Sequence, residues 1–148
     1  MPRVNRTEIC ANDEIQAFHL INRCVRRTYL CGKDRRSRRD YSHRKEWIRA
    51  RLEELAGIFG IDILAFAVMS NHLHVVARNR PDIVAGWSDD EAARRWWNLC
   101  PLRRDRDGTP SEPTECERML TADPARLAEL RLRLSSLSWI MRFLAEPI

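Results

Sequence analysis

The chain has 148 residues, a length that fits one globular domain able to bury a core without disulfide bonds or a structural metal. Its 26 basic and 21 acidic residues give a net charge of +5, which favours polyanionic partners but does not by itself establish them. The sequence has no signal-peptide-like apolar run at its N-terminus and no stretch near the ~18 apolar residues of a membrane-spanning helix. It therefore predicts a cytoplasmic protein without membrane contact.

The numbers of cysteines and lysines exclude further classes of protein. There are five cysteines, an odd number with no Cys-x-x-Cys pair, which argues against a zinc ribbon or a disulfide framework and predicts reduced thiols. Lys33 and Lys45 are the only lysines, so nearly all of the positive charge is arginine. Arginine suits phosphate contacts and stacking on bases, and an arginine excess is equally explained by a GC-rich genome.

The first elements in chain order are a strand, a loop and a helix. Residues 15–24 alternate imperfectly between apolar and polar types and predict a strand, and the arginine-rich residues 33–39 then predict an exposed loop. A helix is expected to begin after Ser42 as its N-cap. Its buried stripe is formed by apolar residues at helical spacing, Ile48, Leu52, Leu55 and Phe59.

The next two elements form a hairpin. Residues 61–68 and 71–78 predict strands joined by a tight turn near Ser70-Asn71, and we expect this hairpin at the centre of a sheet.

The second half of the chain predicts helices. Residues 88–98 predict a short helix, because Ser88 and Glu91 have the spacing of a capping box. Residues 101–118 lack periodicity and predict a loop or insertion that is the most disordered part of the chain. Residues 121–146 predict a helical segment that is split near Ser135-Ser136.

Together these elements predict a single α+β domain over residues 1–148 with a core at about 15–100. An antiparallel sheet is expected to carry helices on one face, with further helices at the C-terminal end.

Two histidines of the second hairpin strand, His72 and His74, are the most informative residues. Side chains alternate along a strand, so both imidazoles are expected on the same face and are able to share one divalent metal ion. Paired histidines on a half-buried strand are also often polar residues that face a groove, and metal motifs usually need more ligands. The spacing alone leaves both interpretations open.

Two stretches taken together resemble a known family. They are Phe18-His-Leu-Ile-Asn-Arg-Cys-Val-Arg-Arg-Thr-Tyr-Leu30 and Phe66-Ala-Val-Met-Ser-Asn-His-Leu-His-Val-Val76, which contains a Met-x-Asn-His-x-His core. The chain resembles the HUH single-strand DNA transposases with one catalytic tyrosine, including those associated with repetitive extragenic palindromes. The resemblance covers roughly residues 15 to 100.

The resemblance implies a fold, an activity and partners. The fold is a ferredoxin-like core, and the activity is cleavage and rejoining of single-stranded DNA through a 5′-phosphotyrosine. The partners are single-stranded DNA or a DNA hairpin, and a second copy of the chain in a homodimer. The cofactor is Mg²⁺ or Mn²⁺, held by His72 and His74 with an oxygen-bearing third ligand on the C-terminal helix. No residue of this chain matches that third ligand.

The catalytic tyrosine of the family has no counterpart at its usual place. The chain contains only Tyr29 and Tyr41, both far upstream of the C-terminal helix that carries the nucleophile in relatives. The catalytic residue is therefore unknown, and Tyr41 is at most a distant substitute. The chain is expected to be a fragment of a longer reading frame or a degenerate member.

Other residues are candidates for supporting and DNA-binding roles. Asn71 is able to orient an imidazole, although Ser-Asn is equally explained as turn chemistry, and His19 is either a groove residue or a structural histidine. Phosphate contacts are expected from the basic residues after the first strand, Arg23, Arg26 and Arg27, which are equally explained as a solvated face. Trp97 is expected to stack on an unpaired base, unless it is a core residue.

The leading hypothesis is thus a transposase-like DNA-binding protein. The second is a catalytically inactive DNA-binding remnant without the nucleophile, and the third is a small metal-binding or ferredoxin-like regulatory domain without a role in DNA binding.

Overall fold

A three-stranded antiparallel sheet forms the centre of the fold. In the computed structural model, the residues described are 13–23 and 29–146. The strands are β1 (Ala17–Arg23), β2 (Ile61–Val68) and β3 (His72–Asn79), and their order in the sheet is β1-β3-β2. The predicted hairpin is confirmed, and β3, which carries the histidines, is the central strand.

The two faces of β3 differ in burial, as its alternating sequence predicts. Leu73, Val75, Ala77 and Asn79 are buried, whereas the residues between them are only half-buried. Leu20 of β1 is the cross-strand partner of Val75 and is also buried. Cross-strand partners point to the same side of a sheet, so these residues form its core face.

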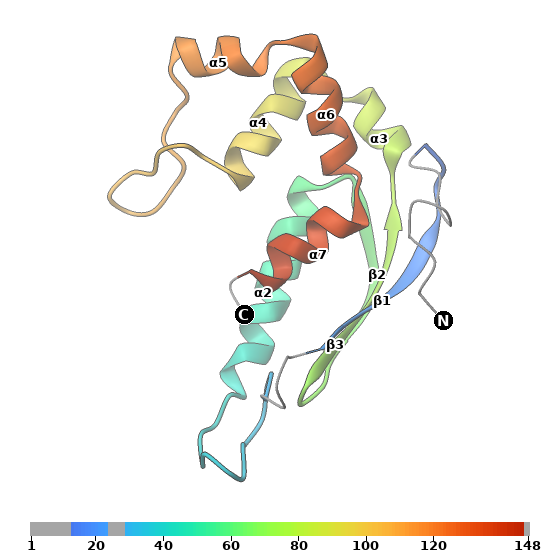
Figure 1. Ribbon diagram of the computed structural model, residues 1–148, viewed down its shortest axis with the longest axis vertical. Coiled ribbons are helices and arrows are strands. Elements are labelled where there is room, and N and C mark those ends of the chain that lie inside the picture. The colour runs from blue at the N-terminus through green and yellow to red at the C-terminus, as the bar shows by residue number, and fades with distance from the viewer. Residues whose placement is uncertain (1–12, 24–28, 147–148) are drawn as a thin grey trace.

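Two helices cover this core face (Figure 1). Helix α2 (His43–Ile58) buries Ile48, Leu52 and Leu55, and the buried Phe59 follows at its end, so the predicted stripe is confirmed. The other is the C-terminal helix α7 (Leu137–Ala145), which buries Leu137, Ile140 and Leu144. Ser42 precedes α2 as predicted, but its side chain makes no capping hydrogen bond.

Four further helices lie mainly beyond the end of the sheet that is opposite to the β2–β3 turn (Figure 1). They are α3 (Pro81–Gly86), α4 (Asp89–Leu99), α5 (Glu115–Thr121) and α6 (Pro124–Leu134). Ser88 caps α4 by accepting a hydrogen bond from the backbone N–H of Glu91, and the break at Ser135-Ser136 separates α6 from α7. Both were predicted, whereas α3 was not.

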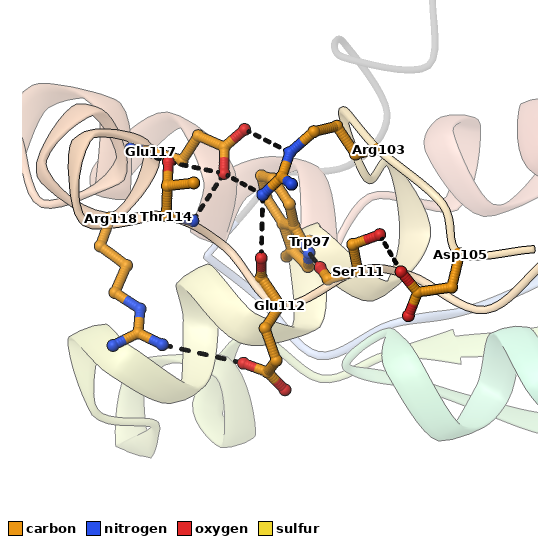
Figure 2. Close-up of polar contacts among 8 residues, drawn as sticks. All are labelled: Trp97, Arg103, Asp105, Ser111, Glu112, Thr114, Glu117 and Arg118. Carbon is orange, nitrogen blue, oxygen red and sulfur yellow. Dashed lines mark hydrogen bonds and ion pairs between the residues drawn. The ribbon is translucent and has the colours of Figure 1, made fainter.

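The prediction of a loop at 101–118 is confirmed for residues 101–114 and is wrong at its C-terminal end, where a helix begins. Helix α5 begins at Glu115, after a capping box between Thr114 and Glu117. Figure 2 shows that the preceding residues are held by polar contacts: Arg103 donates to the Glu117 carboxylate and to the Glu112 carbonyl, and the Ser111 hydroxyl donates to Asp105. Hydrogen bonds between side chains and backbone replace apolar periodicity here, which is why the pattern of the sequence did not reveal the order.

The Arg103–Glu117 pair gives a prediction for titration. The hydrogen bond from Arg103, followed by hydrogen bonds from the Thr114 backbone and hydroxyl, lowers the pKa of Glu117 from 4.5 to about 2. Because the guanidinium stabilises the charged carboxylate, Arg103→Gln is expected to raise this pKa toward 4.5. NMR titration of the Glu117 side-chain carboxyl carbon measures the change.

Asp107 is the control for this measurement. Its pKa is lowered by hydrogen bonds from Thr109 and not by an arginine, so it should stay low in the Arg103→Gln variant. An unchanged Glu117 titration would contradict the ion pair.

The part of the chain that the structure describes is thus an α+β protein with one three-stranded sheet and six helices. Among these described helices, none has the length and apolar character needed to cross a membrane.

Candidate metal centre

His72 and His74 lie side by side on the face of β3 that is opposite to α2 and α7. Both are half-buried and alternate with the buried Leu73 and Val75, so the expectation that they share one face is confirmed. Their ring centroids are 4.7 Å apart, and the ring planes are inclined by 70°. The strand therefore presents two imidazoles from a rigid, central element of the fold.

Asn71 orients the ring of His72. The distance from its side-chain oxygen Oδ1 to His72 Nδ1 is 2.6 Å. An amide oxygen only accepts hydrogen bonds, so this contact is a hydrogen bond in the tautomer in which His72 Nδ1 carries the proton and donates it. The other ring nitrogen, Nε2, then keeps its lone pair, which is the arrangement that a metal-binding histidine requires.

His19 of β1 contacts the ring of His74, as Asn71 contacts the ring of His72. The distance from His19 Nε2 to His74 Nδ1 is 2.7 Å, and the two rings stack with centroids 4.9 Å apart. When His74 Nδ1 donates to His19, the lone pair of His74 Nε2 is free for a ligand. Of the two alternatives that the sequence left open for His19, the structure places it beside the histidine pair, in contact with His74.

The charges around His74 favour its neutral form. Burial lowers its pKa below the ordinary value of 6.5, and electrostatic repulsion from the neighbouring His72, His19 and Arg23 lowers it further. A neutral imidazole is the form that binds metals. His74 is therefore in its metal-binding state at neutral pH.

The donor set of the histidine pair is incomplete for an octahedral metal. Within residues 13–23 and 29–146, no group of three or more histidine, cysteine, aspartate or glutamate side chains is placed to hold a metal ion. Two imidazoles fit two positions of a Mn²⁺ shell, and Mn²⁺ accepts nitrogen ligands more readily than Mg²⁺. The remaining positions require oxygen atoms from water or from a bound phosphate.

The predicted phosphate-binding arginines are only partly described. Arg23 is the cross-strand partner of His72, and it is exposed at the end of β1 on the histidine face. A phosphate held by Arg23 would lie next to the imidazoles. Arg26 and Arg27 lie outside the described residues.

Trp97 lies away from the histidines, in α4 at the other end of the molecule (Figure 1). Its side chain is buried, and its indole N–H donates to the Ser111 carbonyl at 2.7 Å (Figure 2). One side of the residue lines a cavity of about 540 Å³ between α4, α6 and the loop at 110–113. The structure thus gives Trp97 a packing role, and it does not bring Trp97 to the histidine face.

Both tyrosines lie in the segment that crosses from β1 to α2, at the end of the sheet that carries His72. Leu30, next to Tyr29, donates its backbone N–H to the Ser70 carbonyl in the β2–β3 turn. The guanidinium carbon of Arg44 lies 4.5 Å from the centre of the Tyr41 ring. Tyr41 therefore packs against α2.

The histidine face contains one ion pair that sequence reasoning missed. Arg78 of β3 donates to the carboxylate of its cross-strand partner Asp62 at 2.7 Å, and Arg80 donates to the same carboxylate. The register between β2 and β3 was the only signal, because Asp62 and Arg78 are 16 residues apart in the sequence and become neighbours only when the two strands pair. Asp62 and Arg78 lie at the far end of the face, whereas Arg23 is the cross-strand partner of His72.

No family model, curated protein or solved structure matches this chain.

Proposed function

We propose that the chain is a transposase-like protein that binds single-stranded DNA and holds a divalent metal ion, Mg²⁺ or Mn²⁺, with His72 and His74. The observation that carries this proposal is the pair of oriented imidazoles: Asn71 and His19 each contact the Nδ1 of one ring, and when Nδ1 is the donor the Nε2 lone pair is available to a metal ion. Histidines that are merely solvated polar residues do not need partners that set their tautomers.

The order of elements supports the proposal. Strand β1, helix α2 and the β2–β3 hairpin follow one another with the strand order β1-β3-β2. This is the first half of a ferredoxin-like β-α-β-β-α-β arrangement. In the described part of the chain, helices follow β3 where that arrangement has a further strand, so we propose a ferredoxin-like core with a helical C-terminal half.

Each residue of the site has a separate role in this proposal. His72 and His74 hold the metal ion, which when bound polarises a phosphodiester group as a Lewis acid. Asn71 and His19 fix the two rings. Arg23 neutralises a phosphate next to the metal ion.

A second candidate is a DNA-binding protein without strand cleavage. It is favoured by the position of the tyrosines, because none follows Tyr41 in the sequence and Tyr41 packs against Arg44. We expect no covalent protein–DNA adduct from this chain with labelled DNA and Mn²⁺ on a denaturing gel. An adduct that maps to Tyr29 or Tyr41 would instead support a complete enzyme.

The proposed function predicts DNA binding that depends on metal and salt. Fluorescence anisotropy with a labelled oligothymidylate of about 20 nucleotides, longer than a typical single-strand site, measures the dissociation constant. Mn²⁺ is expected to tighten binding by the wild type, and His72→Ala with His74→Ala is expected to abolish this increment. Arg23→Gln should weaken binding and reduce the slope of log affinity against log salt by about 0.7.

The control is His43→Ala, which removes an exposed histidine at the start of α2. It should bind like the wild type. Binding that is absent at every salt concentration would contradict the proposal and favour a metal-binding regulatory domain.

A further inference from the structure

The loop between β1 and α2 contains a dense group of cations. Residues 33–39, which we call the arginine loop, have the sequence Lys-Asp-Arg-Arg-Ser-Arg-Arg, with five cations and one carboxylate in a chain whose net charge is only +5. The side chains of Lys33 and of its four arginines, Arg35, Arg36, Arg38 and Arg39, are exposed. This is a strongly charged patch outside the histidine face.

The arginines of this loop differ from those in the rest of the described structure. Most of the others are matched to carboxylates, as Arg49 is to Glu46 and Arg95 is to Glu91. No arginine of the arginine loop forms an ion pair with a side chain in the described ranges. Unmatched like charges repel one another, so their grouping favours an anionic ligand.

The backbone of the arginine loop is preformed. The Asp34 carboxylate accepts hydrogen bonds from the backbone N–H of Arg36 and the hydroxyl of Ser37, and the Asp34 N–H donates to the Arg39 carbonyl at 2.8 Å. Arg38 has a φ of 57°, a left-handed conformation that an arginine seldom adopts. The fold thus holds at Arg38 a backbone conformation that glycine would adopt more easily.

The residues just before the arginine loop are bonded to the turn that precedes the histidines. The backbone N–H groups of Leu30 and Cys31 both donate to the Ser70 carbonyl, at 2.6 and 3.3 Å. Ser70 precedes Asn71, which orients His72. The loop extends beyond this end of the sheet, next to the start of α2 (Figure 1). The arginine loop and His72 therefore lie at the same end of the sheet.

We propose that the arginine loop is a second phosphate-binding site, which holds the backbone of the single-stranded DNA next to the segment bound at the histidine face. This inference rests on the proposed function for its ligand. The ligand chemistry is that of consecutive phosphodiesters, each contacted by an exposed guanidinium. Such contacts carry affinity and position the strand, and they do not read its sequence.

A pair of variants with the same change in charge tests the proposal. Arg35→Gln with Arg36→Gln removes two cations from the loop, and Arg94→Gln with Arg106→Gln removes two exposed cations from the other end of the molecule. The loop variant is expected to bind the labelled oligothymidylate on the order of tenfold more weakly at about 0.1 M salt. The slope of log affinity against log salt should fall by about 1.4, from two lost contacts. The control variant should stay near the wild type.

A second variant separates charge from backbone geometry. Arg38→Gly removes one cation and suits the left-handed conformation, so the loop should keep its shape while the slope falls by about 0.7. Circular dichroism and thermal unfolding confirm that each variant is folded.

The readouts distinguish this proposal from the proposed function. Isothermal titration calorimetry with Mn²⁺ alone should give wild-type affinity for the loop variants, because the histidines are intact. Loss of DNA affinity with intact Mn²⁺ binding supports the loop site, even if His72→Ala with His74→Ala has no effect on DNA. If the slope of log affinity against log salt were the same for the loop variant and for the Arg94, Arg106 control, the proposal of a second phosphate-binding site would be overturned.

Discussion

Replacing His72 and His74 together by alanine is expected to weaken Mn²⁺ binding more than about 100-fold. The loss should exceed the 10- to 100-fold effect of removing a residue that only orients a ligand, because both nitrogen ligands of the proposed centre disappear. Isothermal titration calorimetry at neutral pH measures the affinity. The metal prediction depends on free lone pairs at both Nε2 atoms, which is a property of the oriented rings and not of the spacing alone.

Asn71→Ala and His19→Ala test the orienting role. Each removes one partner of a ring nitrogen, so each is expected to weaken Mn²⁺ binding about 10- to 100-fold while both ligands remain. His43→Ala is the control, because His43 lies on α2 outside the site. Unchanged affinity in the His72, His74 double variant would refute the metal centre.

Mn²⁺ binding by the histidine pair is expected to weaken at low pH. Protonation removes the lone pair of an imidazole, so Mn²⁺ affinity should fall as the pH decreases. The pKa of His74 is lowered, chiefly by burial and then by the neighbouring His72, His19 and Arg23, so protons compete with Mn²⁺ at a lower pH than they would for an ordinary imidazole. Arg23→Gln removes one of these charges and should move the loss of binding to higher pH. A shift to lower pH would contradict this arrangement.

Replacing Val75 by alanine is expected to lower the free energy of unfolding by about 1.5–3 kcal/mol, because its side chain is fully buried in the core face of the sheet. The adjacent Val76→Ala makes the same chemical change on the half-buried histidine face, and its effect should stay below about 1 kcal/mol. Urea denaturation of both variants, followed by circular dichroism, measures the difference.

The two valine variants test whether one face of β3 is buried and the other is open, as the proposed site requires. Val75 faces Leu20 across the sheet, whereas Val76 has His19 as its cross-strand partner. Equal destabilisation by the two variants would show that both faces of β3 are covered in solution. The histidine face would then be closed to DNA.

Local patterns in the sequence predicted most of the elements. The apolar stripe of α2, the cap of α4, the hairpin and the break between α6 and α7 all follow from periodicity or from residues with strong positional preferences. The sequence patterns did not predict helix α5 with its capping box, or the polar contacts that hold the preceding loop, because contacts such as Arg103 to Glu117 leave no periodic signal.

By itself the sequence determined that His72 and His74 share one face, since the alternation of a strand is a property of the backbone. Only the tertiary structure decided what surrounds them. The register of β1 on β3 brings His19 to His74 and Arg23 to His72, and packing of α4 buries Trp97 far from the site. Contacts such as the bond from Leu30 to Ser70 join residues forty positions apart. Such pairings depend on how the whole core packs, so no local pattern encodes them.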